Sequence, residues 1–246
     1  MGNARCVQYP GWGDKETMTR GFFISGTDTG VGKTCISLGL MRELQAQGHT
    51  VVGMKPVASG CRAVSDGLEN DDALRLQSCS SFPVKYSQVN PYALKSAIAP
   101  HLAARIDGAS IQIPVIRKSF HELSEGAEFI VVEGVGGWLV PINAKQTMQD
   151  VAIDLGLPVV LVVAIRLGCL NHAMLAVAAI RKSGLQLAGW VANRVDLQCE
   201  YADEVVTALG ERLPAALLAD IGYTPDNGAL EKQASRIDLA ALLQTS

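Results

Sequence analysis

Residues 26–34 read Gly-Thr-Asp-Thr-Gly-Val-Gly-Lys-Thr, the strongest structural signal in the chain. A short apolar run at 22–24 precedes them, and apolar residues recur at helical spacing over 36–44. Strand, glycine-rich turn and helix are the context of a phosphate-binding loop. Glycines let backbone N–H groups turn inward, and the helix offers a partly positive N-terminus. The stretch predicts nucleotide binding, with Lys33 on the β/γ-phosphates and the Thr34 hydroxyl on Mg²⁺.

The loop departs from the usual pattern in one place. Its first glycine is expected where Thr27 stands, whereas Gly26 lies one residue earlier. The alternative interpretation is a helix cap with incidental glycines. That interpretation does not explain the presence of Lys33, so phosphate binding is favoured.

Composition narrows the class of protein. The chain has 246 residues, of which 48% are hydrophobic, enough for one sizeable α/β core. A net charge of −3 indicates no basic surface for nucleic acid. The longest apolar run, 158–165, is too short to span a bilayer, and residues 1–20 show no signal-peptide core. Six scattered cysteines without a Cys-x-x-Cys pair predict reduced thiols in a cytoplasmic protein.

Strands and helices alternate along the chain. The first strand is expected at 22–24. Further strands, nearly all of them apolar, are expected at 50–54, 128–134, 158–165, 187–193 and 217–221. One helix is expected to begin at residue 71, and a separate one to end at residue 105. Further helices are expected over 114–123, 172–180, 198–210 and 235–243. Polar loops are expected at 61–70 and before the last helix. The pattern predicts an α/β fold of the P-loop NTPase type, a doubly wound, mainly parallel sheet with helices on both faces. We expect residues 1–19 to be a flexible tail and 20–246 to be a single domain.

Polar residues close several of these strands. Lys55, Glu133 and Asn193 fall at carboxyl ends, which form the ligand-binding edge of such a sheet. Lys55 could instead be a surface lysine. A buried acid such as Glu133 is costly unless it meets a cation, so a Mg²⁺ role is favoured. From spacing alone, Asp71 and Asp72 are typical of a helix cap.

Seven ordered motifs resemble the dethiobiotin synthetases, which are ATP-dependent ligases, over about residues 20–245. The motifs are the glycine-rich loop, Lys-Pro-Val-Ala-Ser-Gly (55–60), Asn-Asp-Asp-Ala-Leu (70–74), Val-Asn-Pro-Tyr (89–92), Val-Glu-Gly-Val-Gly-Gly-Trp (132–138), Leu-Gly-Cys-Leu-Asn-His-Ala-Met-Leu (167–175) and Gly-Trp-Val-Ala-Asn (189–193). The resemblance implies that a diaminononanoate is carbamylated by CO₂, phosphorylated by ATP and closed to dethiobiotin.

The same resemblance implies a role for each matching residue. Catalysis would rest on Lys33, Lys55 and Thr29, and Mg²⁺ would be held by Thr34, Asp72 and Glu133. ATP binding would involve Gly30, Val31, Gly32, Lys33, Thr34, Cys35, Asp72, Glu133, Gly134, Val135, Gly136, Asn193, Arg194, Gly222, Tyr223 and Thr224. Substrate would contact Thr29, Lys55 and Ser59, together with Gly168, Cys169, Leu170 and Asn171 from the neighbouring chain of a homodimer.

Some positions depart from the family pattern. Gly30 stands where some members carry an acid, Arg166 replaces a lysine, and the segment 194–200 is shortened. These changes affect the expected base contacts near Arg194 more than the phosphate site.

Two rival classes share parts of this pattern. Switch ATPases of the partition or site-selection type usually carry a signature lysine where this chain has Asp28, and their membrane-binding members end in a basic helix. Residues 235–246 contain one arginine and no lysine. Amidating enzymes of corrin synthesis need additional glutamine-hydrolysing machinery, for which this length leaves no room.

Overall fold

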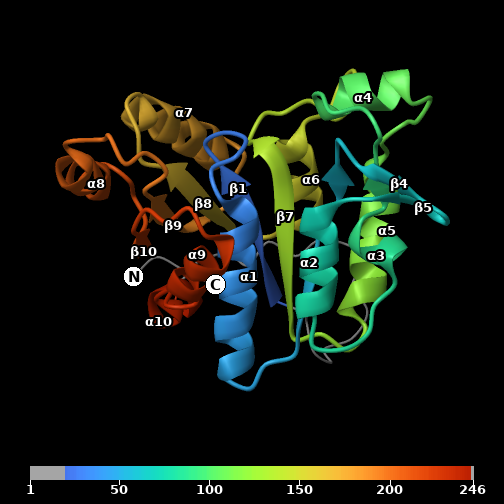
Figure 1. The fold of residues 1–246 in the computed structure, drawn as a ribbon, viewed down its shortest axis with the longest axis horizontal. Helices are drawn as coiled ribbons and strands as arrows, with labels where there is room; N and C mark the ends of the chain where they lie inside the picture. The colour runs from blue at the N-terminus through green and yellow to red at the C-terminus, as the bar shows by residue number, and fades with distance from the viewer. Residues whose placement is uncertain (1–19, 245–246) are drawn as a thin grey trace, which may run out of the picture.

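A parallel six-stranded sheet forms the centre of the protein in the computed structural model, which describes residues 20–244 (Figure 1). Its strand order is β10-β9-β8-β1-β7-β2, and each neighbouring pair is parallel. The strands are β1 (Arg20–Gly26), β2 (Val51–Met54), β7 (Phe129–Gly137), β8 (Val159–Ala164), β9 (Leu187–Asn193) and β10 (Leu217–Ile221). The predicted parallel sheet is confirmed, whereas the predicted tail 1–19 lies outside the described residues.

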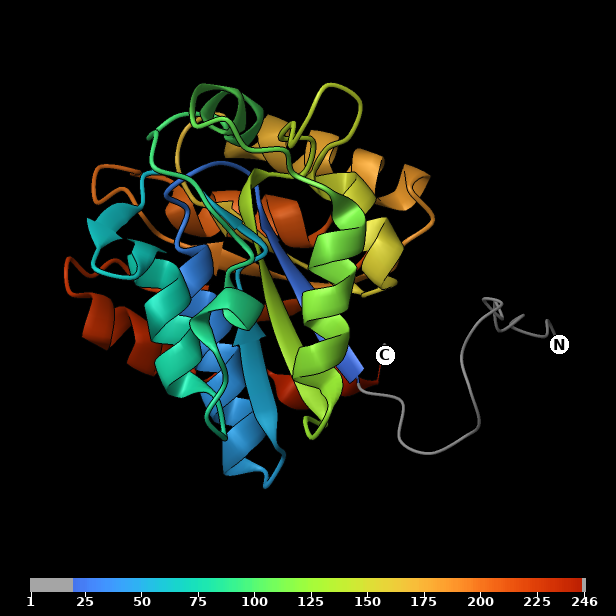
Figure 2. The same ribbon diagram turned by 90° about the vertical axis from the view of Figure 1, so that its right-hand side faces the viewer.

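Helices cover both faces of the sheet, as expected for a doubly wound fold (Figures 1 and 2). One face carries α1 (Lys33–Ala46), α2 (Asp71–Cys79) and α9 (Asn227–Ala234), and the other carries α5 (Ile113–Ser124), α6 (Met148–Leu155) and α7 (Cys169–Lys182). Shorter or peripheral helices are α3 (Tyr86–Val89), α4 (Pro100–Ile106), α8 (Ala202–Gly210) and α10 (Leu239–Leu243). Among residues 20–244, none of the helices combines the length and apolarity of a membrane span.

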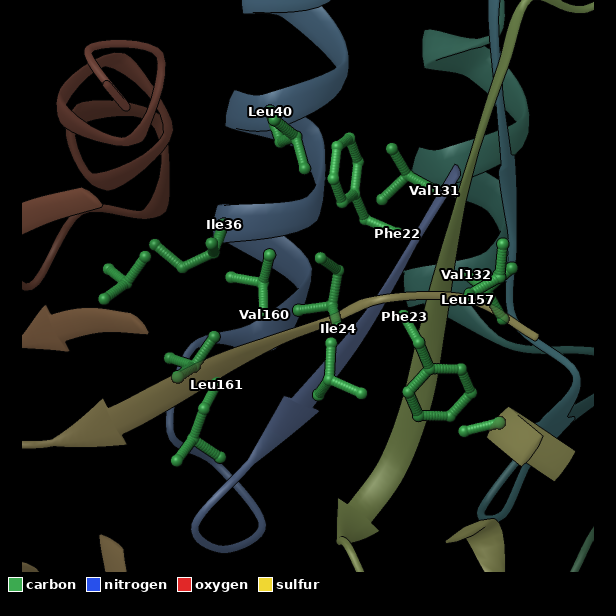
Figure 3. Packing of buried hydrophobic residues seen from close by; sticks show 14 of the residues in the cluster. Phe22, Phe23, Ile24, Ile36, Leu40, Val131, Val132, Leu157, Val160 and Leu161 are labelled. Atoms are coloured by element: carbon green, nitrogen blue, oxygen red, sulfur yellow. The ribbon is translucent and has the colours of Figure 1, made fainter. Parts of the chain in front are cut away.

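The core is packed around β1. Its residues after Arg20 are all buried, because β7 and β8 flank the strand and helices cover it on both sides. The Phe22 ring stacks on Phe129 with centroids 6.2 Å apart, and Phe23 meets Trp138 edge-on at 6.1 Å. Figure 3 shows Phe22, Phe23 and Ile24 among the surrounding buried apolar side chains. Aromatic pairs of this kind add stabilisation beyond the area they bury. The strand that leads into the glycine-rich loop is therefore rigidly held.

The first of the two predicted polar loops proves to be structured. Residues 61–70 contain an antiparallel hairpin of β4 (Arg62–Val64) and β5 (Gly67–Glu69), paired through Val64 and Gly67. Its Asp66-Gly67 pair is a short-range hairpin signal that the sequence interpretation passed over. A further short pair joins β3 (Val57–Ala58) to β6 (Tyr92–Ala93).

The C-terminal region was also wrongly predicted in part. The loop expected before the last helix contains α9, which begins where the Asp226 carboxylate accepts hydrogen bonds from Gly228 N and Ala229 N. The final helix is shortened to α10, and the helix expected from residue 198 begins at Ala202. The unpredicted α6 begins after Thr147, whose N–H donates to Asp150 at 2.6 Å. Helix capping by local side chains explains the starts of α9, α10 and α6, whereas α8 follows Tyr201 without a side-chain cap.

Close packing of α9 on α1 leads to a testable prediction. A Cβ atom added at Gly39 of α1 would lie 2.5 Å from the backbone carbon of Ala234 in α9. We expect Gly39→Ala to lower the free energy of unfolding by about 1–3 kcal/mol, because backbone must move to relieve the clash. Urea denaturation measures this change.

A matched control is Gly210→Ala at the end of α8, where an added Cβ meets nothing within 4 Å. It should be neutral or stabilise by up to about 1 kcal/mol. Equal effects of the two substitutions would contradict the packing argument.

Candidate nucleotide-binding site

The glycine-rich loop connects β1 to α1 at the carboxyl edge of the sheet. Gly32 takes a φ of 93° directly before α1, a left-handed conformation that favours glycine. A Cβ added at Gly26 would lie 2.6 Å from Val31 Cγ2 and 3.1 Å from Lys33 Nζ. The early glycine noted in the sequence is therefore required by the path of the loop.

The Lys33 side chain folds back over the loop. Its Nζ donates to the Asp28 carbonyl oxygen at 2.9 Å, and the residue is only 7% exposed. Burial, followed by the nearby charge of Lys55, lowers the pKa of Lys33 to about 8. A buried cation of this kind is costly by itself and is stabilised by an anion bound next to it.

Lys55 and Glu133 form a buried ion pair beside the loop. Lys55 Nζ donates to Glu133 Oε1, to Asp72 Oδ2 at 3.4 Å and to the Gly134 carbonyl oxygen at 3.4 Å. Burial alone would lower the pKa of Lys55, but the carboxylates of Glu133 and Asp72 outweigh it and raise the pKa. Lys55 is thus a buried cation, and the surface-lysine alternative is wrong.

Glu133 also contacts the glycine-rich loop. Its Oε1 accepts from the Thr34 hydroxyl at 2.9 Å, while its Oε2 is buried and finds no hydrogen-bond partner among the described residues. Such a lone buried oxygen is costly without a partner. Glu133 is therefore constrained to one orientation and retains a free acceptor.

Asp72 does not cap its helix. The cap is Asn70, whose side chain accepts from Ala73 N at 3.2 Å. Asp72 is the second residue of the helix and faces Lys55, whereas Asp71 is exposed and pairs with Arg62 at 2.9 Å. The cap interpretation is thus wrong for both aspartates.

A cavity of ≈ 680 Å³ joins these groups. Among the predicted site residues, its lining contains Thr29, Gly30, Gly32, Lys33, Thr34, Cys35, Lys55, Ser59, Asp72, Glu133, Val135 and Gly136. The Ser59 hydroxyl is buried there without a hydrogen-bond partner among residues 20–244. The phosphate, metal and catalytic positions predicted from the sequence are therefore brought together in one place.

Asn193 and Arg194 lie outside the lining of this cavity. The Asn193 amide nitrogen donates to the Val31 carbonyl oxygen at 2.8 Å, so Asn193 stabilises the backbone of the glycine-rich loop. The Arg194 guanidinium binds Asp220 through two hydrogen bonds, at 2.8 and 2.6 Å, and also pairs with Asp203. Arg194 thereby ties β9 to β10 and α8.

The other predicted positions sit on two loops beside the site. Gly222, Tyr223 and Thr224 follow β10, and the Gln233 side chain of α9 accepts from Gly222 N at 2.9 Å. Gly168 precedes α7, with Cys169, Leu170 and Asn171 in its first turn. Arg166, just before this turn, bridges to Asp28 of the glycine-rich loop at 2.8 Å.

Asn90 is a supporting residue that the sequence interpretation missed. Its buried amide donates to the Lys55 carbonyl oxygen at 2.6 Å, and its Oδ1 accepts from the Tyr86 hydroxyl. Asn90 thus fixes the backbone that carries Lys55. The Val-Asn-Pro-Tyr motif contained this signal without indicating its role.

A glycine-rich loop, two buried lysines and two carboxylates at the carboxyl edge of a parallel sheet define a P-loop nucleotide-binding protein. Residues 20–230 match the family described as AAA domain. The ATP-dependent dethiobiotin synthetase BioD of Xanthomonas campestris pv. campestris is 47% identical over 218 residues, covering 89% of this chain and 97% of the relative. That of Cellvibrio japonicus is 44% identical, covering 91% and 98%. The chain therefore belongs to the ATP-dependent dethiobiotin synthetase family.

Solved structures show the same architecture. The MinD cell division protein of Aquifex aeolicus matches with a TM-score of 0.56 and 15% sequence identity, covering 92% of this chain and 96% of that one. At this identity the likeness concerns the fold alone. The sequence relatives, and not the fold, separate the synthetase from the rival switch ATPase.

The coupling between the two lysines can be tested by titration. We expect ¹³C/¹⁵N-lysine NMR to give a pKa of about 8 for Lys33, and Lys55→Met to raise it, because a neighbouring positive charge is removed. Lys182→Met, at the far end of α7, is the matched charge-removing control and should leave the Lys33 pKa in place. A Lys33 pKa that Lys55→Met does not change would contradict the assigned coupling.

Proposed function

We propose that this enzyme closes the ureido ring of dethiobiotin as a cyclo-ligase. CO₂ adds to one amine of 7,8-diaminononanoate to give a carbamate, and ATP phosphorylates the carbamate oxygen. The second amine then attacks the carbonyl carbon of this mixed anhydride and expels phosphate, leaving dethiobiotin and ADP. Membership of the synthetase family and the cavity around Lys33 and Lys55 support this proposal.

The two lysines have complementary roles in this reaction. Phosphoryl transfer needs positioning and charge neutralisation more than a strong base. Lys33 supplies charge to the β/γ-phosphates, and Lys55, kept protonated by its carboxylate partners, supplies charge to the carbamate. Both act from buried positions, 7% and 4% exposed, where electrostatic interactions are stronger than in solution.

The residues present fit a Mg²⁺ ion. Thr34, Asp72 and Glu133 offer the oxygen ligands that this hard cation prefers, and Glu133 Oε2 has no other partner among the described residues. When bound, the ion would neutralise charge on the phosphates. The described residues include no cluster of three or more His, Cys, Asp or Glu side chains that could hold a metal. Phosphate oxygens and waters would therefore complete the coordination.

Ser59 and Thr29 are proposed to hold the diamine and its carbamate. Both line the cavity beside Lys55, and the Ser59 hydroxyl lacks a partner among residues 20–244. A buried hydroxyl of this kind is available to a polar substrate group. On the other side of the glycine-rich loop, Asn193 and the loop 222–224 are proposed to hold the base, with Arg194 bracing this loop through Asp220.

We also propose a homodimer in which the start of α7 reaches the neighbouring site. The N–H groups of Leu170 and Asn171 at the helix start would bind the substrate's carboxylate there, whereas the Cys169 N–H already donates to the Arg166 carbonyl oxygen. Four large apolar side chains are exposed on this segment, with exposed fractions of 99% for Leu167, 37% for Leu170, 42% for Met174 and 62% for Leu175. Apolar side chains gathered in this way are typical of an interface. A single synthetase domain over 20–246 and a cytoplasmic location, supported by the scattered cysteines, belong to the same proposal.

The central experiment measures product and nucleotide together. Incubating the enzyme with diaminononanoate, bicarbonate and MgATP should give one ADP for each dethiobiotin formed. Lys33→Ala should reduce turnover by roughly 10²–10³-fold, the usual effect of losing one group that stabilises transition-state charge. Steady ATP hydrolysis that ignores the diamine would overturn the proposal and favour the switch ATPase.

A second prediction concerns the metal. Glu133→Gln keeps the shape of the side chain but loses its charge, so we expect the Mg²⁺ concentration for half-maximal activity to rise about tenfold or more. Glu128→Gln, at the residue directly before the same strand, is the matched control and should leave the Mg²⁺ titration unchanged. An identical titration for both variants would return Glu133 to a purely structural role.

A third prediction tests the shared site by mixing two inactive variants. Lys33→Ala disables phosphate binding, and Asn171→Asp places a repelling charge beside the substrate carboxylate without the strain that a side chain would meet at Gly168, where φ is 92°. In a shared dimer, subunit exchange puts both lesions into one site of each heterodimer. About a quarter of all sites should then be intact. If each chain completes its own site, mixing will recover no activity.

A further inference from the structure

Two arginines converge on one glutamate at the junction of three helices. Arg42 of α1 and Arg75 of α2 each donate to a separate carboxylate oxygen of Glu231 in α9. The Glu231 side chain is 12% exposed, against 33% for Arg75 and 47% for Arg42. One carboxylate cannot neutralise two guanidinium groups, which stay protonated at any ordinary pH. The cluster therefore retains one surplus positive charge.

Arg75 differs from Arg42 in where it points. Arg75 lines the nucleotide cavity together with Lys33, Thr34, Cys35 and Asp72, whereas Arg42 lines only an outer hollow of ≈ 490 Å³. The Arg75 guanidinium nitrogen Nη2 also lies 3.8 Å from the Cys35 sulfur, in the first turn of α1. Arg75 is therefore the member of the cluster whose positive charge can act on a ligand in the cavity.

The position of α9 indicates which part of the nucleotide Arg75 can meet. In a phosphate-binding loop the lysine takes the β/γ-phosphates, and the α-phosphate lies toward the base. Arg75 sits between Cys35 of the phosphate side and Glu231 of α9, which in turn holds the proposed base loop through Gln233 and Gly222. Leu230 of the same helix lies 3.9 Å from a Cβ built on Gly32. Arg75 is thus placed between the phosphate end and the base end of the site.

We propose that Arg75 is a nucleotide-binding residue that contacts the α-phosphate, and that Glu231 holds its guanidinium at the edge of the cavity. This inference rests on the proposed nucleotide site and adds a residue to it. A guanidinium suits this task because it can bind a carboxylate and a phosphate oxygen at once through separate N–H groups. Arg42 offsets the charge of Glu231, so that this carboxylate does not repel the incoming phosphates.

The alternative is that Arg75 only joins α2 to α9. Both roles predict lower stability when Arg75 is replaced, so stability cannot separate them. Nucleotide affinity can, because Arg42→Met breaks the same kind of ion pair with the same glutamate but removes no group from the cavity. Arg42→Met is therefore the matched control.

The experiment measures the dissociation constants of MgATP and MgADP by isothermal titration calorimetry for the full chain. We expect Arg75→Met to weaken both nucleotides by a similar factor of about tenfold or more, since the α-phosphate is common to them. Arg75→Lys should recover part of the loss by restoring the charge. Arg42→Met should weaken both nucleotides far less than Arg75→Met, because it leaves every group that lines the cavity in place.

Two results would overturn the inference. Equal affinities for Arg75→Met and Arg42→Met would reduce Arg75 to a structural link. Weaker binding of MgATP with unchanged MgADP would move the contact to the γ-phosphate. Wild-type protein that binds no MgATP would instead defeat the nucleotide site itself, and the two failures are thereby distinguished.

Discussion

The register between β2 and β7 is the constraint on which the site depends. Met54 pairs with Val132, so the next residues along the two parallel strands are Lys55 and Glu133. Ile24 pairs with Glu133 on the other side of β7, which brings this carboxylate beside the strand that enters the glycine-rich loop. A slip of one residue would turn every side chain of a strand to the opposite face and separate the charges. The backbone hydrogen bonds of the sheet therefore position the chemistry.

The Lys55–Glu133 pair has a cost that explains its surroundings. Lys55 is 4% exposed and Glu133 is 1% exposed, and taking two charges out of water to this extent consumes most of what their attraction returns. Breaking such a pair from one side costs about 3–5 kcal/mol, because the remaining charge stays buried. Hydrogen bonds to Asp72, Thr34 and the Gly134 carbonyl oxygen offset part of this desolvation cost. The arrangement is retained at the ligand-binding edge of the sheet, where its charges can act on a substrate.

Much of this site could be predicted because it lies at the ends of strongly apolar strands. The apolar runs fixed the strands, and a parallel sheet brings their carboxyl ends to one edge, which located Lys55 and Glu133. The direction of individual side chains could not be predicted in this way. Asn193 was placed on the correct edge, but its bond to Val31 depends on how the glycine-rich loop turns beneath it. The hairpin at 62–69 and the capped helices were missed because their signals are short and local.

Arg75 and Glu231 illustrate a second limit of sequence interpretation. They are 156 positions apart, and neither belongs to a motif that indicates chemistry, so only the packing of α9 and of α2 against α1 brings them together. Gly39 makes this packing possible, since its missing side chain lets the backbone of Ala234 approach. A substitution that looks like a matter of core packing can therefore reach the nucleotide cavity.

Charge balance connects these observations. Lys33 and Lys55 face Glu133 and Asp72, so the buried cluster is close to neutral before any ligand arrives. A nucleoside triphosphate adds about three to four negative charges, which Lys33 and Lys55 cannot neutralise alone, because Lys55 is already paired with carboxylates. We therefore propose that further positive charge comes from a divalent ion on the oxygen ligands and from a cation on the base side of the loop. Arg75 is held where such a cation is needed, and the carboxylate that holds it is itself balanced by Arg42.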